Sequence, residues 1–545
     1  MKLYKSLLLL AIFLCVLPRS SWALSSANIP LDSPIYLYLE KLAGYGLVTS
    51  DIKGIRPYSK SEAARLLLEA EGRLEAGEYP PLAREICSRL RTLIPREAFL
   101  HDRPDPAPLF DFNPVSNARL RYVHLDGVPR DYFRTFNDPG NDGVFGIGSG
   151  LRPPNPYPSP SQQRGSEGTP LMENNEGVIY REGHNFDIRF DTEGYFGRIA
   201  SFLVEPMYLW SEADRKSTLR LDKGYLKIGG GGIELEAGRD ENWLGLGYRG
   251  AITLTDNPKN FDFVKLSSPE PVVSRYLWDL KYTLLVAQSE RTVTDGQERQ
   301  PMFMAAKVSF KPLEQLEFGI NLGRQVGGPG IDNSTLETLR GLIGGFNNDN
   351  SNSLAGIELR WRIPSLRNTE IFAEYSGEDA AAFWPIVESY VAGFYIPRLT
   401  ADGADDLRFE YFLGNNILYA NGTFPEGYLR YDLPIGHSQG GASQDFFLRY
   451  SHWFSPRNNL AIEGIRTTRG DMGRLPIDAT GRYDAAGTME ALEKKYAVRV
   501  FWMVPVKGEW NALLSWGHER VENFNLQPGV NRTNELLRAE LSYRY

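Results

Sequence analysis

The chain has 545 residues, enough for one very large domain or for two to four ordinary ones. Its formal net charge is −8, and this becomes −11 if residues 1–23, which contain three basic residues and no acidic one, are removed. The acidic balance argues against a nucleic-acid partner, and the only cysteine beyond residue 23, Cys87, cannot form an internal disulfide.

The N-terminus predicts a secretory signal peptide over residues 1–23. Lys2 and Lys5 precede an apolar run, and small residues at Ser21 and Ala23 suit cleavage after Ala23. Beyond this segment, no stretch approaches the roughly 20 apolar residues that a membrane-spanning helix needs. The mature chain is therefore either soluble or crosses a membrane as strands.

Residues 24–100 are expected to form a small bundle of three amphipathic helices in the periplasm. Ser33, which is followed by proline, has the features of an N-cap, and Ser59 with Glu62 forms a capping box. The third predicted helix contains Cys87 among apolar residues at helical spacing. This pattern favours a core position for Cys87 over a reactive thiol.

From about residue 115 to the end, the period of the apolar residues changes from 3.6 to 2. The segments "NFDIRFD" (185–191) and "GIELRWRIP" (356–364) place apolar side chains on one face and polar ones on the other. A soluble sandwich would turn the polar face to water, whereas a membrane barrel would turn it to the lumen. The 28 Tyr, 28 Phe and 10 Trp suit the aromatic girdles of an outer-membrane barrel.

The lengths of the connections favour the barrel. Short links alternate with long polar ones, as tight periplasmic turns alternate with extracellular loops in an up-and-down barrel. The short links are 192–195, 229–232, 312–314, 364–368, 414–416, 455–458 and 505–508, and the long ones are 126–184, 240–250, 289–301, 324–353, 377–405, 423–441, 470–493 and 522–533. One link, 257–274, is an exception: it is long, although its place in the alternation is that of a short periplasmic turn.

This pattern predicts a mainly β fold, with a transmembrane antiparallel barrel of about 18 strands over residues 101–545. Its last strand, in "NELLRAELSYRY", alternates up to the aromatic Tyr545 and is expected to close on the first strand. We expect the protein to be monomeric.

We find no motif of an enzyme, a cofactor site or a metal site. "GLGYRG" (245–250) matches a dinucleotide fingerprint by letter, but no helix is predicted after it. The six histidines lack metal-binding spacing, and the acid pairs Asp240-Glu241 and Asp405-Asp406 are interpreted as solvated loop charges rather than catalytic pairs. We therefore expect no catalysis, cofactor or metal ion.

Three stretches resemble the Wzi family of capsule-assembly outer-membrane proteins. They are "GIRPYSKSEAARLL" (54–67), "NNEGVIYREGHNFDIRF" (174–190) and "EAGRDENWLGLGYRGAITLTDNPKNFDFVKLSSPEP" (236–271), of which the third is the most specific. In order and type the resemblance covers nearly all of the mature chain, and in detail it covers residues 33–270. It implies an 18-stranded barrel with a small periplasmic helical bundle, placed in the cell outer membrane, which binds capsular polysaccharide at the surface.

The candidate glycan-binding residues lie in the predicted extracellular loops. The resemblance is sharpest at Arg239, Asp240 and Trp243, which the preceding strand is expected to deliver to the extracellular rim; Trp384 and Tyr157 are further candidates. An aromatic face can pack on a sugar ring while polar groups bond its hydroxyls. The alternative is that such loop aromatics pack the loops together and plug the barrel.

Three functions are compatible with the sequence. The first is binding of capsular or extracellular polysaccharide to assist its attachment or assembly, without catalysis. The second is a diffusion channel for small polar solutes, which a polar lumen would permit. The third is an outer-membrane hydrolase, for which the sequence offers no triad or dyad. The other partners expected of such a barrel are outer-membrane lipid and the barrel-assembly machinery.

Overall fold

The structure is a computed structural model. It describes residues 24–102, 107–137, 160–172, 174–230, 232–274, 278–294, 296–342, 351–378, 385, 387–415, 417–470 and 491–544. The predicted signal peptide and the residues Tyr157, Trp384 and Tyr545 lie outside the described residues.

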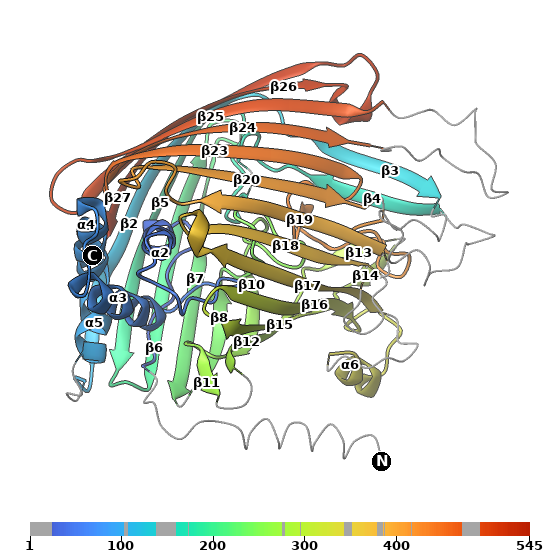
Figure 1. Ribbon diagram of the computed structural model, residues 1–545. Helices are drawn as coiled ribbons and strands as arrows, with labels where there is room; N and C mark the ends of the chain where they lie inside the picture. Colours follow the sequence, from blue (N-terminus) through green and yellow to red (C-terminus); the bar gives the residue numbers. More distant parts are fainter. Residues whose placement is uncertain are drawn as a thin grey trace.

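Eighteen strand positions close into one antiparallel barrel, shown in Figure 1. The order of the strands around the barrel follows the chain, and the last strand, β27 (Arg532–Arg544), pairs with the first, β2 (Asp111–Asp126). This confirms the predicted closure. The strands between them are β5 (Gly183–Phe196), β6 (Ala200–Ser211), β7 (Lys216–Gly230), β8 (Ile233–Asp240), β10 (Phe261–Ser267), β11 (Val272–Ser274), β12 (Trp278–Gln288), β15 (Met302–Leu313), β16 (Leu316–Val326), β17 (Ser351–Ile363), β18 (Thr369–Glu378), β19 (Val387–Ile396), β20 (Asp405–Gly414), β23 (Ser443–Ser455), β24 (Asn458–Arg469), β25 (Glu493–Pro505) and β26 (Trp510–Glu522).

The polar face of the strands points inward and the apolar face points outward. In β5, Phe186 and Ile188 are 45% and 42% exposed, whereas Asp187 is fully buried. In β17, Trp361 is 48% exposed and Arg360 is only 3% exposed. A soluble sandwich would show the reverse arrangement, so the alternation distinguishes the two architectures that the sequence left open.

The described part of the N-terminal region, from residue 24 to 102, has four helices where the sequence predicted three. They are α2 (Pro34–Gly44), α3 (Lys60–Glu75), α4 (Pro81–Leu93) and α5 (Pro95–Asp102), and a fifth helix, α6 (Thr335–Leu342), lies in a loop. The additional helix arises because Pro95, which suits a first helical turn, restarts the helix just after α4 ends. None of the helices in the described part of the chain is long and apolar enough to cross a membrane.

The predicted N-caps at Ser33 and Ser59 are confirmed, whereas the Glu62 carboxylate of the predicted capping box accepts from Arg65. The side chains of Ser33 and Ser59 accept hydrogen bonds from the backbone N–H groups of Ile35 and Glu62. Cys87 lies in α4, is 3% exposed and belongs to the helical core. Burial raises the pKa of its thiol to about 12, which keeps it protonated and unreactive.

The barrel has two distinct ends, which we call the helix end and the loop end. Helices α2 to α5 and the final residues of β27 lie at the helix end, on the left of Figure 1, and the short turns lie at the same end of the barrel wall. The longer connections lie at the loop end, with the hairpins β3 (Asp131–Asn137) to β4 (Pro160–Ser166) and β13 (Thr292–Thr294) to β14 (Gln297–Arg299). The predicted alternation of link lengths thus describes most of the barrel.

Three predicted links are corrected. The predicted short link 192–195 lies inside β5, and the turn between β5 and β6 is 197–199. The range 377–405 was expected to be one long loop, but it contains β19, so that 397–404 is a turn at the helix end. The range 414–416 is correspondingly not a short turn, since Gly414 ends β20 and the loop-end connection runs from 415 to 442. Strand β19, "VESYVAGFYI", was overlooked because its inward positions, Ser389, Val391, Gly393 and Tyr395, carry no charge and so do not alternate clearly with the outward ones.

The exceptional link 257–274 also has an explanation. It contains both β10 and β11, and both of these pair with β12, so that together they fill one position in the barrel. The wall is short here, since β8 ends at Asp240 and β10 begins at Phe261. The connection between them, 241–260, turns into the lumen.

The lumen is filled by four segments: 24–59, 167–182, 241–260 and 417–442. The first contributes β1 (Ile55–Arg56), which pairs with β9 (Trp243–Leu244) of the third. Ile55 packs in one core cluster with Leu244 and with Tyr428, which is fully buried. The hydroxyl of Tyr428 donates to the carbonyl of Thr253 at 2.9 Å. For Tyr428, packing of the plug is thus the interpretation that the structure supports.

Helix α2 is fastened to the turns at the helix end. Lys41 Nζ donates to the carbonyls of Pro397 and Gly403 at 2.8 and 2.9 Å and pairs with Asp406 at 2.9 Å. The hydroxyl of Tyr38 donates to the carbonyl of Pro456 at 2.7 Å. These contacts close the helices over this mouth of the barrel.

Candidate functional site

The three residues expected to act together at an extracellular rim point in different directions. Arg239 lies on the outer face of β8 and forms a bidentate ion pair with Asp262, with both N–O distances at 2.7 Å. Asp240 points inward, is 3% exposed and accepts from Asn28 Nδ2 at 2.7 Å. Neighbouring strand residues alternate between the two faces, so a continuous sequence motif here does not form a continuous site.

Trp243 lies inside the barrel, and the predicted position at the rim is wrong for this residue. Its side chain is 3% exposed, and the guanidinium carbon of Arg56 lies 4.5 Å from its ring centroid. The chain reaches this place because the short wall at β8 and β10 directs the connection 241–260 into the lumen and against β1.

The acid pairs are also not the solvated loop charges that were expected. Asp240 and Asp406 are 3% and 5% exposed. Asp406 pairs with Lys41 and accepts from Trp453 Nε1 at 2.8 Å. Both carboxylates therefore fix the N-terminal segment against the barrel wall.

The "GLGYRG" stretch is a packing motif of the plug. The carboxylate of Glu410, on the inner face of β20, accepts from the backbone N–H groups of Tyr248, Arg249 and Gly250 at 2.7 to 3.3 Å. A Cβ on Gly250 would lie 2.1 Å from the ring of His437. Glycine is needed here for close approach, which explains the spacing without a nucleotide.

A cavity of about 360 Å³ runs along the inner wall of β23 to β27. The plug contributes Trp243 and Tyr248 to its lining, and the wall contributes Phe501 and the triad Arg449, Glu463 and Arg499, in which the glutamate bonds both arginines. The indole N–H of Trp243 is buried and has no hydrogen-bond partner among the described residues. The volume lies at the lower end of small-molecule pockets, which span about 300 to 1,000 Å³.

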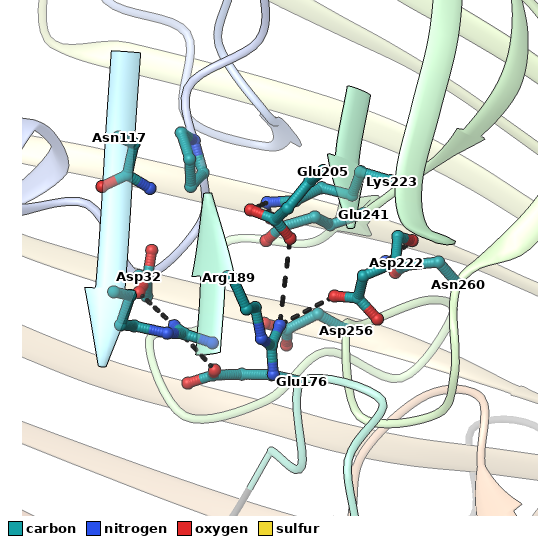
Figure 2. A pocket seen from close by; sticks show the side chains of 12 residues that line it. Asp32, Asn117, Glu176, Arg189, Glu205, Asp222, Lys223, Glu241, Asp256 and Asn260 are labelled. Carbon is teal, nitrogen blue, oxygen red and sulfur yellow. Dashed lines mark hydrogen bonds and ion pairs between the residues drawn. The ribbon is translucent and has the colours of Figure 1, made fainter. Parts of the chain in front are cut away.

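A smaller cavity of about 20 Å³ lies next to it and shares Asp32, Glu176 and Asp256 with it (Figure 2). The carboxylates gather around guanidinium groups, and Arg119 Nη1 lies 2.7 Å from Asp32 and 3.2 Å from Glu176. Burial raises the pKa of Asp256, whereas the nearby arginines hold the pKa of Glu176 well below its usual value although burial opposes them. In the described part of the chain, no group of three or more His, Cys, Asp or Glu is arranged to hold a metal ion.

A basic and aromatic patch lies at the loop end, beside the short wall of β8 and β10. We call it the Tyr431 patch; it consists of Arg220, Arg239, Lys259, Arg430 and Tyr431. Tyr431 is 48% exposed, and Lys259 Nζ and the Arg430 guanidinium carbon lie 5.4 and 5.3 Å from its ring centroid. Of the residues predicted from sequence, only Arg239 belongs to this patch.

The other patch residues were missed because they come together only in the fold. Lys259 and Arg430 are 171 positions apart, and Arg430 Nε donates to the carbonyl of Lys259 at 2.8 Å. The sequence has one local signal of this site: the dipeptide Tyr431-Asp432 lies between two short apolar segments. Because the dipeptide contains neither glycine nor asparagine, it does not predict a tight hairpin turn.

A family model described as capsule assembly protein Wzi matches residues 152–536, which is more than half of the chain. Among solved structures, the chain is similar to Wzi, an outer membrane protein involved in group 1 capsule assembly in Escherichia coli and described as a carbohydrate-binding β-barrel. That match has 14% identity and a TM-score of 0.64, and it covers 96% of this chain and 100% of that one.

Other solved structures are less similar. OpdL and OprD of Pseudomonas aeruginosa share 13% and 11% identity with the chain, at TM-scores of 0.39 and 0.40. Both matches cover 81% of this chain, and they cover 99% and 95% of the respective partners. No curated protein sequence matches the chain.

Proposed function

Because the chain belongs to the Wzi family of capsule assembly proteins, we propose that it binds capsular or other extracellular polysaccharide at the cell surface and assists its attachment or assembly, without catalysing a reaction. As a member of this family, the protein is an outer-membrane β-barrel. The observation that carries the proposal is the family match across residues 152–536, which spans most of the barrel.

The outward face of the barrel supports a transmembrane placement. Exposed aromatic side chains such as Trp361, Phe454 and Trp502, at 48%, 60% and 45%, stand on it where lipid would meet the strands. In this placement the helix end faces the periplasm and the loop end faces the outside. Residues 1–23 would serve as the signal peptide, 24–100 as the periplasmic helical domain and 101–545 as the barrel.

The same placement implies the remaining partners. The outer face would contact outer-membrane lipid, and insertion would require the barrel-assembly machinery. The closing pair of β2 and β27 leaves no free edge in the described barrel wall, which supports a monomer.

The alternative function, a diffusion channel, has less support. Four segments fill the lumen, and their contacts with the wall are buried ion pairs and hydrogen bonds. A solute would have to displace this plug, whereas polysaccharide bound at the loop end would not.

The test is retention of polysaccharide. Cells that produce the protein should hold more surface polysaccharide after washing than cells in which the gene is deleted, and the purified protein should bind polysaccharide on a glycan array. If the purified, folded protein binds no polysaccharide and deletion leaves retention unchanged, the proposal is wrong.

A further inference from the structure

Four of the five residues in the Tyr431 patch are cationic, and the nearby carboxylates are those of Asp222, Asp262, Glu290 and the exposed Asp432 of the same turn. Three of its cations have carboxylate partners: Arg220 with Asp222 at 2.9 Å, Arg239 with Asp262 at 2.7 Å, and Arg430 with Glu290 at 3.6 Å. Among the described residues, Lys259 has no carboxylate within ion-pair distance. One lysine charge is thus left available beside an exposed aromatic ring.

The environment of Lys259 shows how closely the positive charges are gathered. Partial burial and the guanidinium groups of Arg220, Arg239 and Arg430 lower the pKa of Lys259 from its ordinary value. The carboxylate of Asp262 opposes this effect but does not cancel it, so an anionic ligand placed beside Lys259 would favour the charged lysine.

Tyr431 is presented by a turn that is fixed on several sides. The strands β21 (Leu429–Arg430) and β22 (Leu433–Pro434) pair on either side of a two-residue turn. Tyr431 N donates to Glu290 Oε1 at 2.6 Å, and Ser166 N donates to the carbonyl of Asp432 at 2.8 Å. The ring therefore keeps its exposed position without help from a ligand.

The turn has a conformation that its residues disfavour. Tyr431 and Asp432 have φ angles of 49° and 64°, in the left-handed region, where a two-residue hairpin turn usually has Asn-Gly. A bulky aromatic at such a position is uncommon, and strained residues of this kind gather at ligand sites. A large aromatic ring thus stands at a position where a small residue such as Asn or Gly would make the turn more stable.

We propose that the Tyr431 patch binds carboxylated sugar units of an extracellular polysaccharide, with the carboxylate paired to Lys259 and the sugar ring packed on Tyr431. The polysaccharide part of this inference rests on the proposed function, whereas the charge and the geometry of the patch do not. Aromatic packing on the sugar and a charge-assisted bond to its carboxylate together favour an acidic over a neutral glycan.

The experiment uses the full-length mature protein, purified in detergent, and two soluble probes: alginate oligomers, which are polyuronates, and dextran oligomers, which are neutral. Wild-type protein should bind alginate more tightly than dextran, and the affinity for alginate should fall as salt is added, since exposed charges are screened. Tyr431→Ala and Lys259→Gln should each weaken alginate binding by about 5- to 30-fold, a typical loss for one anchoring side chain.

Lys507→Gln is the matched control, because Lys507 is exposed in a turn at the helix end; it should bind alginate as wild type does. Heat-modifiability on gels should confirm that every variant is folded. Unchanged alginate binding by the folded Tyr431→Ala and Lys259→Gln variants would overturn the inference while leaving the proposed function intact. Equal binding of dextran and alginate by wild type would overturn the preference for acidic sugars. If neither probe nor any array glycan binds wild type and gene deletion leaves retention unchanged, the proposed function itself is wrong.

Discussion

At the scale of single residues, the most consequential side chain is Asp51, in the connection between α2 and β1. It is 3% exposed, and its carboxylate accepts from Lys311, Arg360 and Arg362 at 2.9 to 3.1 Å. These three cations belong to β15 and β17, so Asp51 joins the plug to the barrel wall.

We expect Asp51→Asn to lower the free energy of unfolding by about 3 to 5 kcal/mol, because it leaves three buried cations short of a counter-charge. Urea unfolding of the purified protein measures this change. Glu314→Gln, at an exposed position in a nearby turn, should leave the unfolding midpoint unchanged. Equal midpoints for Asp51→Asn and wild type would show that this carboxylate does not hold the plug.

The stabilising effect of Asp51 should depend on pH. The guanidinium groups of Arg360 and Arg362 and the Lys311 ammonium hold the pKa of Asp51 well below its usual value, although burial opposes them. A carboxylate with a lowered folded-state pKa contributes stability that is complete above the unfolded pKa of about 3.9 and is lost as the pH falls through the folded value. The gap in unfolding free energy between wild type and Asp51→Asn should therefore be constant from pH 7 to about 5 and narrow below about 4.

We expect Trp243 to contribute to the stability of the fold rather than to ligand binding. Its ring is buried against Arg56, so Trp243→Ala should lower the free energy of unfolding by about 3 to 5 kcal/mol, as large-to-small changes in cores do. Trp243→Phe keeps most of the packing and should cost clearly less. Trp502→Phe, on the outer face of β25, is the control. If the Trp243→Ala protein is folded and as stable as wild type but binds polysaccharide more weakly, Trp243 belongs to the glycan site instead.

At the scale of elements, strand β19 decides the side of the barrel on which 397–404 lies. The turn contacts α2 through Lys41 and through Tyr45, whose hydroxyl donates to the Asp402 carbonyl at 3.0 Å. The hairpin β13 to β14 lies at the opposite end.

Labelling of single cysteines on intact cells tests this arrangement. In a Cys87→Ala background, an impermeant thiol reagent should label Gln297→Cys, in the exposed hairpin, and should not label Thr400→Cys, in the turn beside the helices. Both should label once the cells are lysed, which controls for reactivity. If only Thr400→Cys is labelled on intact cells, the barrel has the opposite orientation in the membrane from the one proposed.

At the scale of the whole molecule, the filled lumen predicts a barrel that does not conduct. In planar bilayers the wild-type protein should show little steady conductance compared with an open porin. Replacement of residues 417–441 by a short Gly-Ser linker removes one plug segment and should raise the conductance of protein that remains heat-modifiable. Large steady conductance of wild type would favour the diffusion channel instead.

The sequence alone determined the class of the fold and most of its elements. The period of 2 over four hundred residues, the alternation of link lengths and the caps at Ser33 and Ser59 are local signals, and local signals survive without knowledge of the fold. The prediction missed two elements whose local signals are weak. Strand β19 has no charged residue on its inward face, and helix α5 follows α4 almost without a break.

The candidate site was decided by the tertiary structure. Arg239, Asp240 and Trp243 are close in sequence but lie apart in the fold. Arg239 is on the outer face of β8, where it pairs with Asp262. Asp240 points inward to Asn28, and Trp243 lies in the lumen against Arg56. Lys259 and Tyr431 meet because two loops far apart in the chain pack at the same place. No residue pattern encodes such a meeting locally, since it depends on where the barrel wall ends and on which segments fill its lumen.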